Sequence, residues 1–438
     1  MTRRTIVIGG GISGAVAARR LAHAGEEVVL LERSDHLGGL VTSFELAGTP
    51  LECFYHHVFP HEREIRELID DLGLGPRLGW YPSSVGVLSG GRVWPFTTPW
   101  DLLRFGPLPP VDRIRAGLGA LRMGRVRDWE ELDEMPARDW LTRYTGARTT
   151  EVVWDPLLRA KFGPAAASVP AAWMWARFQQ RAGARTGRGE QLGYLRGGFR
   201  QLFEALERDL SGHGVDLRVA TAVEGIEVDG RAVTGVSTTA GPVEGDAVIY
   251  AGTLPGISRL VPPHLVEPSW EPADGLGVLC VVVELTRPVS DIYWTNVCEP
   301  TLPFGGLIEH TNLIPTSDYG GRHVIYLSRY FVPSEPVAAA EVVVEAGRWV
   351  AALVDLVPGL GPSDVLGVHP FRAPYAAPLV RTGYRRIVPP LHSAIEGLLL
   401  ATTAQVYPQD RGMSEAVRLG NDAAGALLVD RAGNDRDR

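Results

Sequence analysis

The chain has 438 residues, more than the ~250–300 at which a single hydrophobic core stops growing, so we expect two domains. Hydrophobic residues make up 45% of the chain and charged residues 21%, which is typical of a globular protein with a substantial core. The net charge of -8 gives no support for nucleic-acid binding, and we expect no nucleic-acid partner.

Three cysteines lie far apart in the sequence without a CxxC pair, which argues against a disulfide framework or a zinc site. We therefore expect a reducing, cytoplasmic location and no bound metal. No run of about 18 apolar residues is present, so we expect no integral membrane segment. Contact with a membrane surface and the oligomeric state stay open.

The N-terminal segment predicts a β-α-β unit, with a β-branched strand at 5–8, an alanine-rich helix at 12–23 and a strand at 27–31. A helical pattern follows at 51–74. Residues 76–190 then mix proline-rich turns with helices, a pattern that indicates an insertion rather than part of a regular parallel sheet.

Regular order returns near residue 197, where a helix and short strands precede a group of strands without helices between them. Strands that follow one another in this way imply an antiparallel sheet. The predicted elements are a helix at 199–209, strands at 216–219, 222–228, 232–238, 247–250, 278–285, 306–310 and 323–330, a helix at 338–356, a strand at 398–401 and a helix at 413–429.

Together these patterns predict an α/β chain in which two domains are interleaved. One is a parallel, Rossmann-type nucleotide-binding domain, and the other is an α+β substrate-binding domain that contains the antiparallel sheet. We assign 1–75, 191–255 and 386–430 to the first domain, 76–190 and 256–385 to the second, and 431–438 to a frayed polar tail.

Gly9, Gly11 and Gly14 form a GxGxxG motif directly after the first predicted strand and at the start of the first predicted helix. Gly9 permits the tight turn, Gly11 lets the backbone approach a pyrophosphate, and Gly14 lets the helix and strand pack closely. The first N–H groups of that helix attract phosphates, and Glu32 at the end of the second strand can accept hydrogen bonds from ribose hydroxyls. The motif in this register predicts a bound dinucleotide.

Proteins that bind NAD and proteins that bind FAD both carry this motif, and the residues after Glu32 distinguish the two classes. Gly38 and Gly39 stand in the run ERSDHLGGLVTS, which resembles the extended motif of the flavin amine oxidase and protoporphyrinogen oxidase superfamily. The run SGAVAARRLAHAGEEVVLLERSDHLGG is also similar to UDP-galactopyranose mutase, another flavoprotein. The resemblance implies a glutathione-reductase-like domain that binds one FAD, with the double glycine closing over the diphosphate.

The resemblance continues far from the N-terminus. YLRGGFRQLFEALERDL, VATAVEGIEVDGRAVTGV and EGLLLATTAQVYPQDRGMSEAVRLGNDAA resemble further FAD-domain segments, and DPLLRAKFGPAAASVPAAW resembles a substrate-domain segment of protoporphyrinogen oxidases. Ala401, Thr402 and Thr403 stand where the superfamily usually has Gly-Asp. The resemblance therefore implies that Thr402, Thr403 or the nearby Asp410 replaces that aspartate at the ribityl chain. The implied FAD-binding residues are Gly9, Gly11, Ile12, Ser13, Gly14, Glu32, Arg33, Gly38, Gly39, Leu40, Val223, Thr402, Thr403, Asp410, Gly412, Met413 and Ser414.

Candidate catalytic residues follow from their chemistry and position. His56 and His57, in ECFYHHVFPHE, are candidate proton handlers because an imidazole titrates near neutral pH, and His57 aligns with a flavin-side histidine of the mutase. Arg159 and Lys161 stand in an apolar run, where they would bind an anionic substrate, stabilise reduced flavin or form an interdomain ion pair. Tyr407 directly precedes the helix expected to point at the flavin.

A polar block at the end of a predicted strand supplies the substrate candidates. Glu309, His310 and Asn312 would line a substrate cavity or form a solvated strand end. The arginines of 104–127 and 177–200 are interpreted mainly as solvated helix faces, and Trp173 and Trp175 mainly as core.

The single Rossmann motif leaves no second nucleotide-binding domain for NAD(P)H. We therefore predict an FAD-dependent oxidase or dehydrogenase that transfers a hydride from a C–C, C–N or C–O bond of a small-molecule substrate to flavin N5. A non-redox sugar mutase resembling UDP-galactopyranose mutase and a non-catalytic flavin-binding module are the alternatives. The substrate and the electron acceptor stay open.

Overall fold

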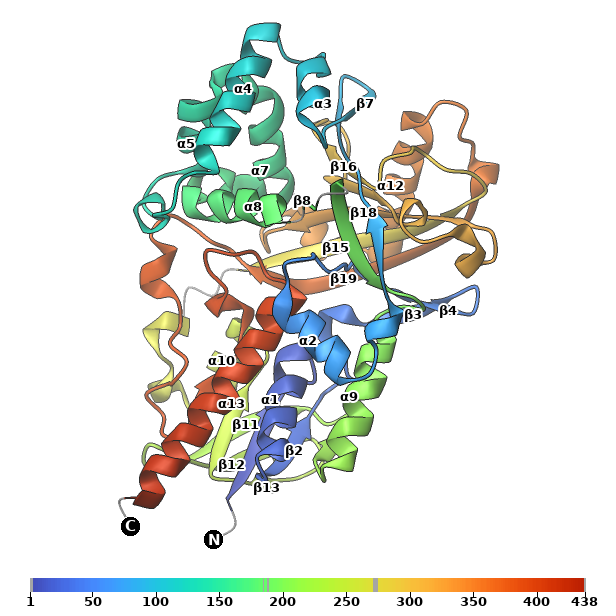
Figure 1. The fold of residues 1–438 in the computed structure, drawn as a ribbon. Coiled ribbons are helices and arrows are strands. Elements are labelled where there is room, and N and C mark those ends of the chain that lie inside the picture. The colour runs from blue at the N-terminus through green and yellow to red at the C-terminus, as the bar shows by residue number, and fades with distance from the viewer. Residues whose placement is uncertain (1–2, 184, 187–188, 271–274, 437–438) are drawn as a thin grey trace.

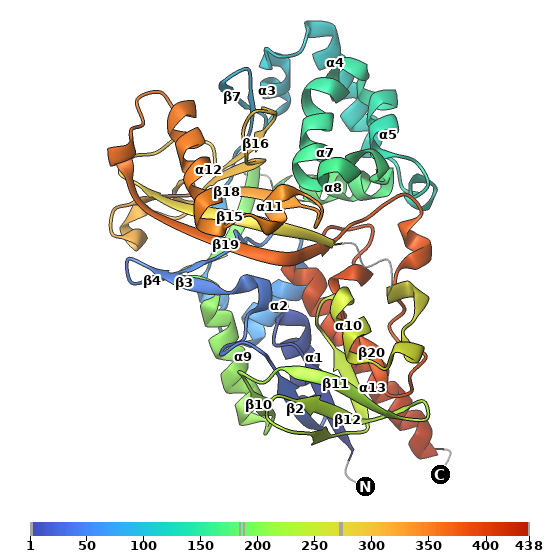
Figure 2. The ribbon, with the colours of Figure 1, turned by 180° about the vertical axis from the view of Figure 1, so that it is seen from behind.

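The computed structural model describes residues 3–183, 185–186, 189–270 and 275–436. Two bodies share the chain, one built on a parallel sheet and the other on a large antiparallel sheet flanked by helices (Figure 1). Both termini lie at the end of the first body that points away from the second (Figures 1 and 2). The predicted mixture of a parallel α/β body and an antiparallel body is confirmed.

The parallel sheet has the strand order β10-β2-β1-β14-β20. Its strands are β10 (Asp216–Arg218), β2 (Glu27–Leu31), β1 (Arg4–Ile8), β14 (Ala247–Tyr250) and β20 (Leu398–Leu400). The central strands are buried at nearly every position, as expected for a parallel sheet that is covered on both faces. Segments from the start, middle and end of the chain therefore meet in one sheet.

Different elements cover the two faces of this sheet. One face carries the helices α1 (Ile12–His23), α9 (Arg200–Gly212) and α13 (Met413–Arg436). The other carries the small antiparallel sheet β11 (Val223–Asp229), β12 (Ala232–Thr238) and β13 (Val243–Glu244), with α10 (Leu254–Leu260) beside it (Figure 2). The apolar side chains on the two faces form separate cores.

The C-terminal helix is longer than the sequence predicts. It continues to Arg436, so the expectation of a frayed tail is wrong for 431–436. Arg431 is only 7% exposed; it forms one ion pair with Glu26 and another with Asp246 at 2.7 Å. These pairs neutralise a buried guanidinium, which the polar composition of the segment does not reveal. Residues 437–438 lie outside the described residues.

The second body is built on a seven-stranded sheet with the order β19-β15-β18-β17-β16-β6-β7. Its strands are β19 (Val365–Pro378), β15 (Gly275–Leu285), β18 (His323–Phe331), β17 (Gly306–Glu309), β16 (Trp294–Val297), β6 (Val85–Ser89) and β7 (Arg92–Pro95). Neighbouring strands are antiparallel except β16 and β6, which pair in parallel. This pairing joins the two insertions into one sheet.

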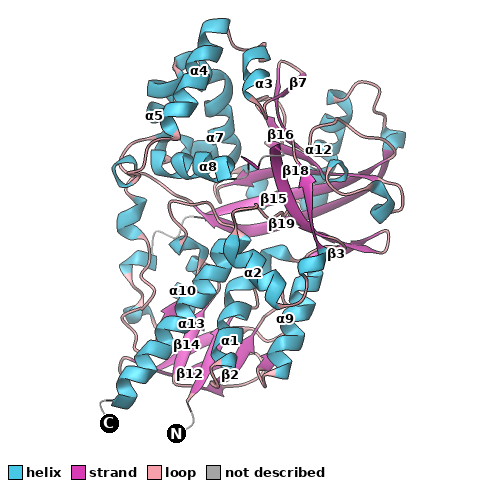
Figure 3. Ribbon diagram, viewed as in Figure 1, coloured by secondary structure: helices cyan, strands magenta, loops and turns pink. Residues whose placement is uncertain are grey.

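Helices gather on one side of the antiparallel sheet (Figure 3). They are α3 (Pro99–Arg104), α4 (Pro110–Met123), α5 (Ala137–Thr145), α6 (Ala147–Thr149), α7 (Asp155–Phe162) and α8 (Ala171–Gly183). A small antiparallel sheet has the order β5-β9-β8, with β5 (Leu78–Pro82), β9 (Gly189–Leu195) and β8 (Arg185–Thr186). The helix predicted at 338–356 is divided into α11 (Pro336–Ala339) and α12 (Val342–Leu356).

The helical pattern predicted at 51–74 is wrong over its first part. The chain first forms the hairpin of β3 (Ser43–Leu46) and β4 (Thr49–Glu52), and only then α2 (Arg63–Asp71). The Glu52 carboxylate is buried and accepts hydrogen bonds from the Tyr194 hydroxyl and the Phe199 amide, each at 2.6 Å. These long-range bonds hold the segment extended, and no local periodicity predicts them.

Candidate active site

A cavity of about 2170 Å³ extends from the parallel sheet to the antiparallel sheet and the helical group. Its walls include the ends of β1 and β2, strands β16 to β18, and helices α3, α4, α7 and α8. Small-molecule pockets usually measure ~300–1000 Å³. The cavity therefore has room for a dinucleotide and a substrate together.

The three motif glycines have different environments at one end of the cavity. Gly9 has a φ of +106°, which L side chains rarely adopt, and a Cβ on Gly14 would lie 1.9 Å from the Gly9 carbonyl oxygen. A Cβ on Gly11 would meet only the Gly39 Cα, at 4.0 Å, so the space before Gly11 is open. Gly9 and Gly14 are thus required by the fold, whereas Gly11 leaves room for a ligand.

This end of the cavity fits the diphosphate and ribose of a dinucleotide. Helix α1 begins at Ile12 after an N-cap glycine without a side-chain cap, and its positive end faces the cavity. The Glu32 carboxylate accepts hydrogen bonds from the amides of Gly10 (2.6 Å) and Ser34 (2.8 Å). Its two oxygens together offer about four lone pairs, so acceptor positions stay available for ribose hydroxyls.

Most of the residues implied for FAD line this cavity, and three do not. Gly14 packs against Gly9 and Ala251, the Thr402 amide donates to Gln405 Oε1 (2.7 Å), and the Ser414 hydroxyl donates to Glu64 Oε2 (2.7 Å). These three therefore support the backbone around the cavity instead of facing it. Those that line it are Gly9, Gly11, Ile12, Ser13, Glu32, Arg33, Gly38, Gly39, Leu40, Val223, Thr403, Asp410, Gly412 and Met413.

Lys161 on α7 and Arg177 on α8 meet Asp410, from the loop before α13, in the cavity wall. Lys161 forms a hydrogen-bonded ion pair with Asp410, and Arg177 Nη1 lies 3.5 Å from the same carboxylate oxygen. Burial alone would raise the pKa of Asp410, but Lys161 and Arg177 hold that pKa at about 2. Burial lowers the pKa of Lys161. The interdomain ion pair, one of the expectations for Lys161, is present and borders the cavity.

Arg411 and two tyrosines form a second buried polar group beside this pair. The Arg411 guanidinium donates to the Tyr330 hydroxyl at 3.0 Å, and the Tyr55 hydroxyl lies 3.5 Å from that same oxygen. Burial alone would raise the pKa of Tyr330, but Arg411 and Lys161 lower it. The Tyr330 hydroxyl is therefore a better hydrogen-bond donor than an ordinary phenol.

His56 and His57 both line the cavity. Burial lowers the pKa of His56 to about 4 and that of His57 to about 3, which favours neutral rings, and proton transfer by either histidine stays a prediction. His56 Nδ1 lies 2.6 Å from the Phe54 carbonyl and donates to it, which leaves Nε2 as an acceptor. His57 Nδ1 is buried without a hydrogen-bond partner among the described residues.

Two other catalytic candidates lie outside the cavity wall. Arg159 is exposed on α7 and is separated from the cavity, although Lys161 on the same helix lines it. The Tyr407 hydroxyl donates to Asp133, and its ring packs against Trp129 with centres 5.7 Å apart. Tyr407 therefore anchors the loop before α13 to the helical group.

The polar block predicted for substrate also lies elsewhere. The Glu309 carboxylate is buried and accepts hydrogen bonds from the amides of Val289 and Ser290, each at 2.8 Å. His310 Nε2 lies 2.7 Å from the Tyr319 hydroxyl, and Asn312 donates to the Ser290 carbonyl at 2.8 Å. None of Glu309, His310 and Asn312 lines the cavity, because each fixes a turn next to β17.

Several residues of the cavity wall were not assigned to a site from the sequence. Trp173, Arg177 and Arg181 on α8 all line the cavity. Trp173 is also buried in the core, as expected, whereas the interpretation of Arg177 and Arg181 as a solvated face is corrected. Their spacing of four residues places them on one helix face, and this is the signal that could have found them. Arg329, Arg372 and Asn296 come from separate strands and had no such signal.

The cavity wall is strongly cationic although the chain is acidic. The described residues that line it include ten arginines and lysines but only three carboxylates, Glu32, Glu62 and Asp410. The whole chain has a net charge of -8. A wall of this charge attracts anionic ligands.

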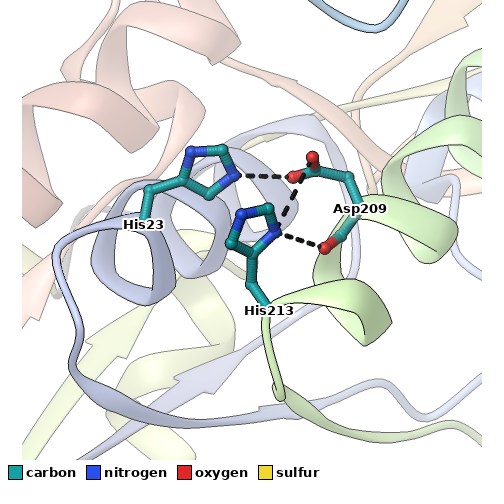
Figure 4. Close-up of side chains that lie close together, drawn as sticks. All are labelled: His23, Asp209 and His213. Carbon is teal, nitrogen blue, oxygen red and sulfur yellow. Dashed lines mark hydrogen bonds and ion pairs between the residues drawn. The ribbon is translucent and has the colours of Figure 1, made fainter.

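A separate polar cluster joins two helices of the first body away from the cavity (Figure 4). His23 Nε2 lies 2.9 Å from Asp209 Oδ2, and His213 Nδ1 donates to the Asp209 backbone carbonyl at 2.8 Å. Arg19 Nε donates to the same carboxylate at 3.0 Å. The carboxylate already has a cationic partner, so the cluster is explained as a contact between the ends of α1 and α9.

Among the described helices, none combines the length and apolar character needed to cross a membrane.

Comparison with known proteins agrees with this geometry. A coproporphyrinogen III oxidase from Propionibacterium freudenreichii subsp. freudenreichii is 26% identical over 345 residues, which cover 65% of this chain and 63% of that protein. The chain thus spans less than two thirds of the length of the first curated relatives it matches.

Two solved structures share the fold over nearly the whole chain. A putative protoporphyrinogen oxidase from Exiguobacterium sp. 255-15 has a TM-score of 0.80 at 18% identity, covering 98% of this chain and 99% of that one. Reduced UDP-galactopyranose mutase has a TM-score of 0.75 at 16% identity, covering 98% of this chain and 96% of that one. The family model for flavin containing amine oxidoreductases matches residues 12–428. The chain therefore belongs to the flavin containing amine oxidoreductase family, and its cofactor is FAD.

Proposed function

We propose that this chain is an FAD-dependent oxidoreductase that takes a hydride from a small-molecule substrate carrying an acidic group. The observation that carries the proposal is the cationic cavity wall, which continues from the glycine motif to the antiparallel sheet. The FAD-lining residues described above would hold the cofactor at the motif end. The names of the curated relatives, several of which are oxidases, support the same class of reaction.

FAD, when bound, supplies the two-electron chemistry. The chain's own residues bind and orient the substrate. Arg177 and Arg181 lie on one face of α8 and line the cavity, and although each also has a carboxylate 3.5 Å away (Asp410 and Glu190), their guanidinium groups have further donors for the substrate's acidic end. The buried tyrosine pair of Tyr55 and Tyr330 and the neutral ring of His57 offer hydrogen bonds without adding negative charge.

Matched pairs of compounds test this proposal, each pair an acid and its methyl ester. Holoenzyme is mixed with each compound without oxygen, and the loss of visible flavin absorbance is followed. We expect acids to reduce the flavin faster than their esters, and the Arg177→Gln variant to lose that preference. Equal rates for acids and esters would contradict the anionic substrate. Product formation only by pre-reduced enzyme, with no acceptor consumed, would instead indicate a mutase.

His57→Ala is expected to lower turnover about tenfold while FAD stays bound, because one buried hydrogen bond to the substrate or cofactor is lost. Since His57 stays neutral above a pKa of about 3, the ratio of wild-type to variant rates is expected to be constant from about pH 5 to 8. Steady-state rates across this pH range and the flavin content of the variant check the prediction. A ratio that changes around the ordinary pKa of histidine would show that His57 titrates during turnover.

We also propose a cytoplasmic location. Cys53, Cys280 and Cys298 are all unpaired and buried, which is consistent with a reducing compartment.

A further inference from the structure

Two neighbouring helices at the outer end of the cavity carry an exposed apolar face. Six of the thirteen exposed large apolar side chains among the described residues are found there. On α4 they follow the spacing i, i+3, i+7, i+10, which is one stripe of a helix. This α3–α4 apolar face consists of Trp100 (68% exposed), Leu103 (44%), Val111 (76%), Ile114 (56%), Leu118 (50%) and Leu121 (61%).

The opposite side of α4 is fixed against the protein. Ala116, Gly119 and Met123 are buried there. A Cβ on Gly119 would lie 2.4 Å from the Tyr144 carbonyl oxygen, so the helix packs directly on the backbone of α5. The helix cannot turn its apolar stripe inward without losing this contact, and the stripe therefore stays exposed to whatever surrounds the protein.

Arginines flank the α3–α4 apolar face. Residues 99–127 contain two acidic side chains, Asp101 and Asp112, against six arginines, in a chain whose net charge is -8. Arg115 and Arg122 lie seven residues apart beside the stripe, which places them in one row along the helix. The exposed arginines are Arg104, Arg115, Arg122, Arg125 and Arg127. This local positive charge complements an anionic surface.

The cavity opens on this same face. Leu103, Ile114, Leu118 and Leu121 belong both to the exposed apolar face and to the residues that line the cavity. Whatever covers the apolar face also borders the cavity entrance.

We propose that the α3–α4 apolar face docks on the surface of a bilayer that contains anionic phospholipids. An apolar stripe with flanking arginines is the pattern of a helix that lies in the membrane interface, with its apolar side among the acyl chains and its cations at the headgroups. Helix α4 has 14 residues, fewer than the ~20 needed to span a bilayer, so it lies on the surface. On the further assumption of the proposed function, the substrate is an amphiphilic acid that enters the cavity from the lipid.

Flotation of FAD-loaded protein with vesicles tests this proposal. We expect binding to vesicles of phosphatidylcholine mixed with phosphatidylglycerol, and weaker binding to phosphatidylcholine alone. The Ile114→Glu/Leu118→Glu double variant is expected to lose binding at least about tenfold, because two exposed apolar side chains no longer enter the lipid. The Arg115→Glu/Arg122→Glu variant is expected to bind less and to lose most of the salt dependence.

The matched control is the Val343→Glu/Val344→Glu variant on α12. These valines are 68% and 59% exposed and do not line the cavity, so this variant is expected to bind vesicles like the wild type. A wild-type protein that does not float with anionic vesicles would overturn the proposal, as would equal losses in the control. Self-association that only Ile114→Glu/Leu118→Glu abolishes, without vesicle binding, would make the face a protein interface and also overturn it. Flavin content and substrate reduction, measured without vesicles, report separately on the proposed function.

Discussion

Replacing Gly11 by valine is expected to abolish FAD retention while leaving the chain folded. The backbone at Gly11 has a φ of -71° and a ψ of 179°, which any residue adopts. The new Cβ would meet no protein atom closer than 4.0 Å, so the added methyl groups project into the space meant for the ligand. Overpacking of this size costs about 3 kcal/mol, which is roughly a hundredfold in affinity. Visible flavin absorbance and thermal unfolding of the purified variant measure the two effects.

Two further valine variants serve as controls for this prediction. Gly347→Val on α12 also meets no protein atom within 4 Å and is far from the cavity, so it should retain FAD like the wild type. Gly14→Val should fail to fold stably, because its Cβ would lie 1.9 Å from a carbonyl oxygen. A Gly11→Val protein that purifies fully loaded with FAD would place the cofactor elsewhere. An unfolded one would mean that Gly11 serves the backbone as Gly14 does.

Asp410→Asn is expected to lower the free energy of unfolding by about 3 kcal/mol at neutral pH, since it leaves Lys161 and Arg177 without their shared buried anion. Urea denaturation measures the change. The loss should shrink as the pH rises. Burial already lowers the pKa of Lys161, and removing Asp410 lowers that pKa further, so Lys161 sheds its proton and its buried charge sooner in the variant.

The sign of this dependence follows from proton binding. A lysine whose pKa is lower in the folded state binds fewer protons there than in the unfolded state, so alkaline pH favours folding. Asp422→Asn is the control, because Asp422 forms an exposed ion pair with Arg418 at 3.4 Å, in which the Arg418 side chain is 44% exposed. The free energy of unfolding of this variant should fall by less than about 0.5 kcal/mol. If Asp410→Asn were no less stable than the wild type, the ion pair of Lys161 and Asp410 would not hold the two bodies together. The same conclusion would follow if the loss in free energy of unfolding grew at alkaline pH.

Local patterns were enough to predict the parts of the fold that neighbouring residues determine. The strand at 27–31 and the helix at 12–23 agree with β2 and α1 because glycine spacing and apolar periodicity act within a few residues. The strand order of the sheet did not follow from any such pattern. The start of α2 was misplaced because the segment before it is held by bonds from Tyr194 and Phe199, more than a hundred residues away.

The candidate site also has one part that the sequence predicts and another that it does not. The glycine motif and Glu32 are contiguous enough for the sequence to place them at one end of the cavity. The cationic wall is assembled from the helices α4, α7, α8 and α10, two strands and several loops. Of its contacts, the sequence allowed only an interdomain ion pair of Lys161 to be anticipated, as one alternative. Glu309 was misleading because a strand-end carboxylate that binds backbone amides has the same sequence pattern as one that faces a substrate.

The place of α13 has a consequence for how the protein is made. Helix α1 is synthesised long before α13, the helix that packs against it, and β20 joins the same sheet only shortly before α13 is made. Until then one edge of the parallel sheet and the apolar side of α1 have no cover, and nascent chains in this state are prone to aggregate. Gly412 and Met413, at the start of α13, line the cavity, so the FAD site is complete only once this late segment has been made and has packed against α1.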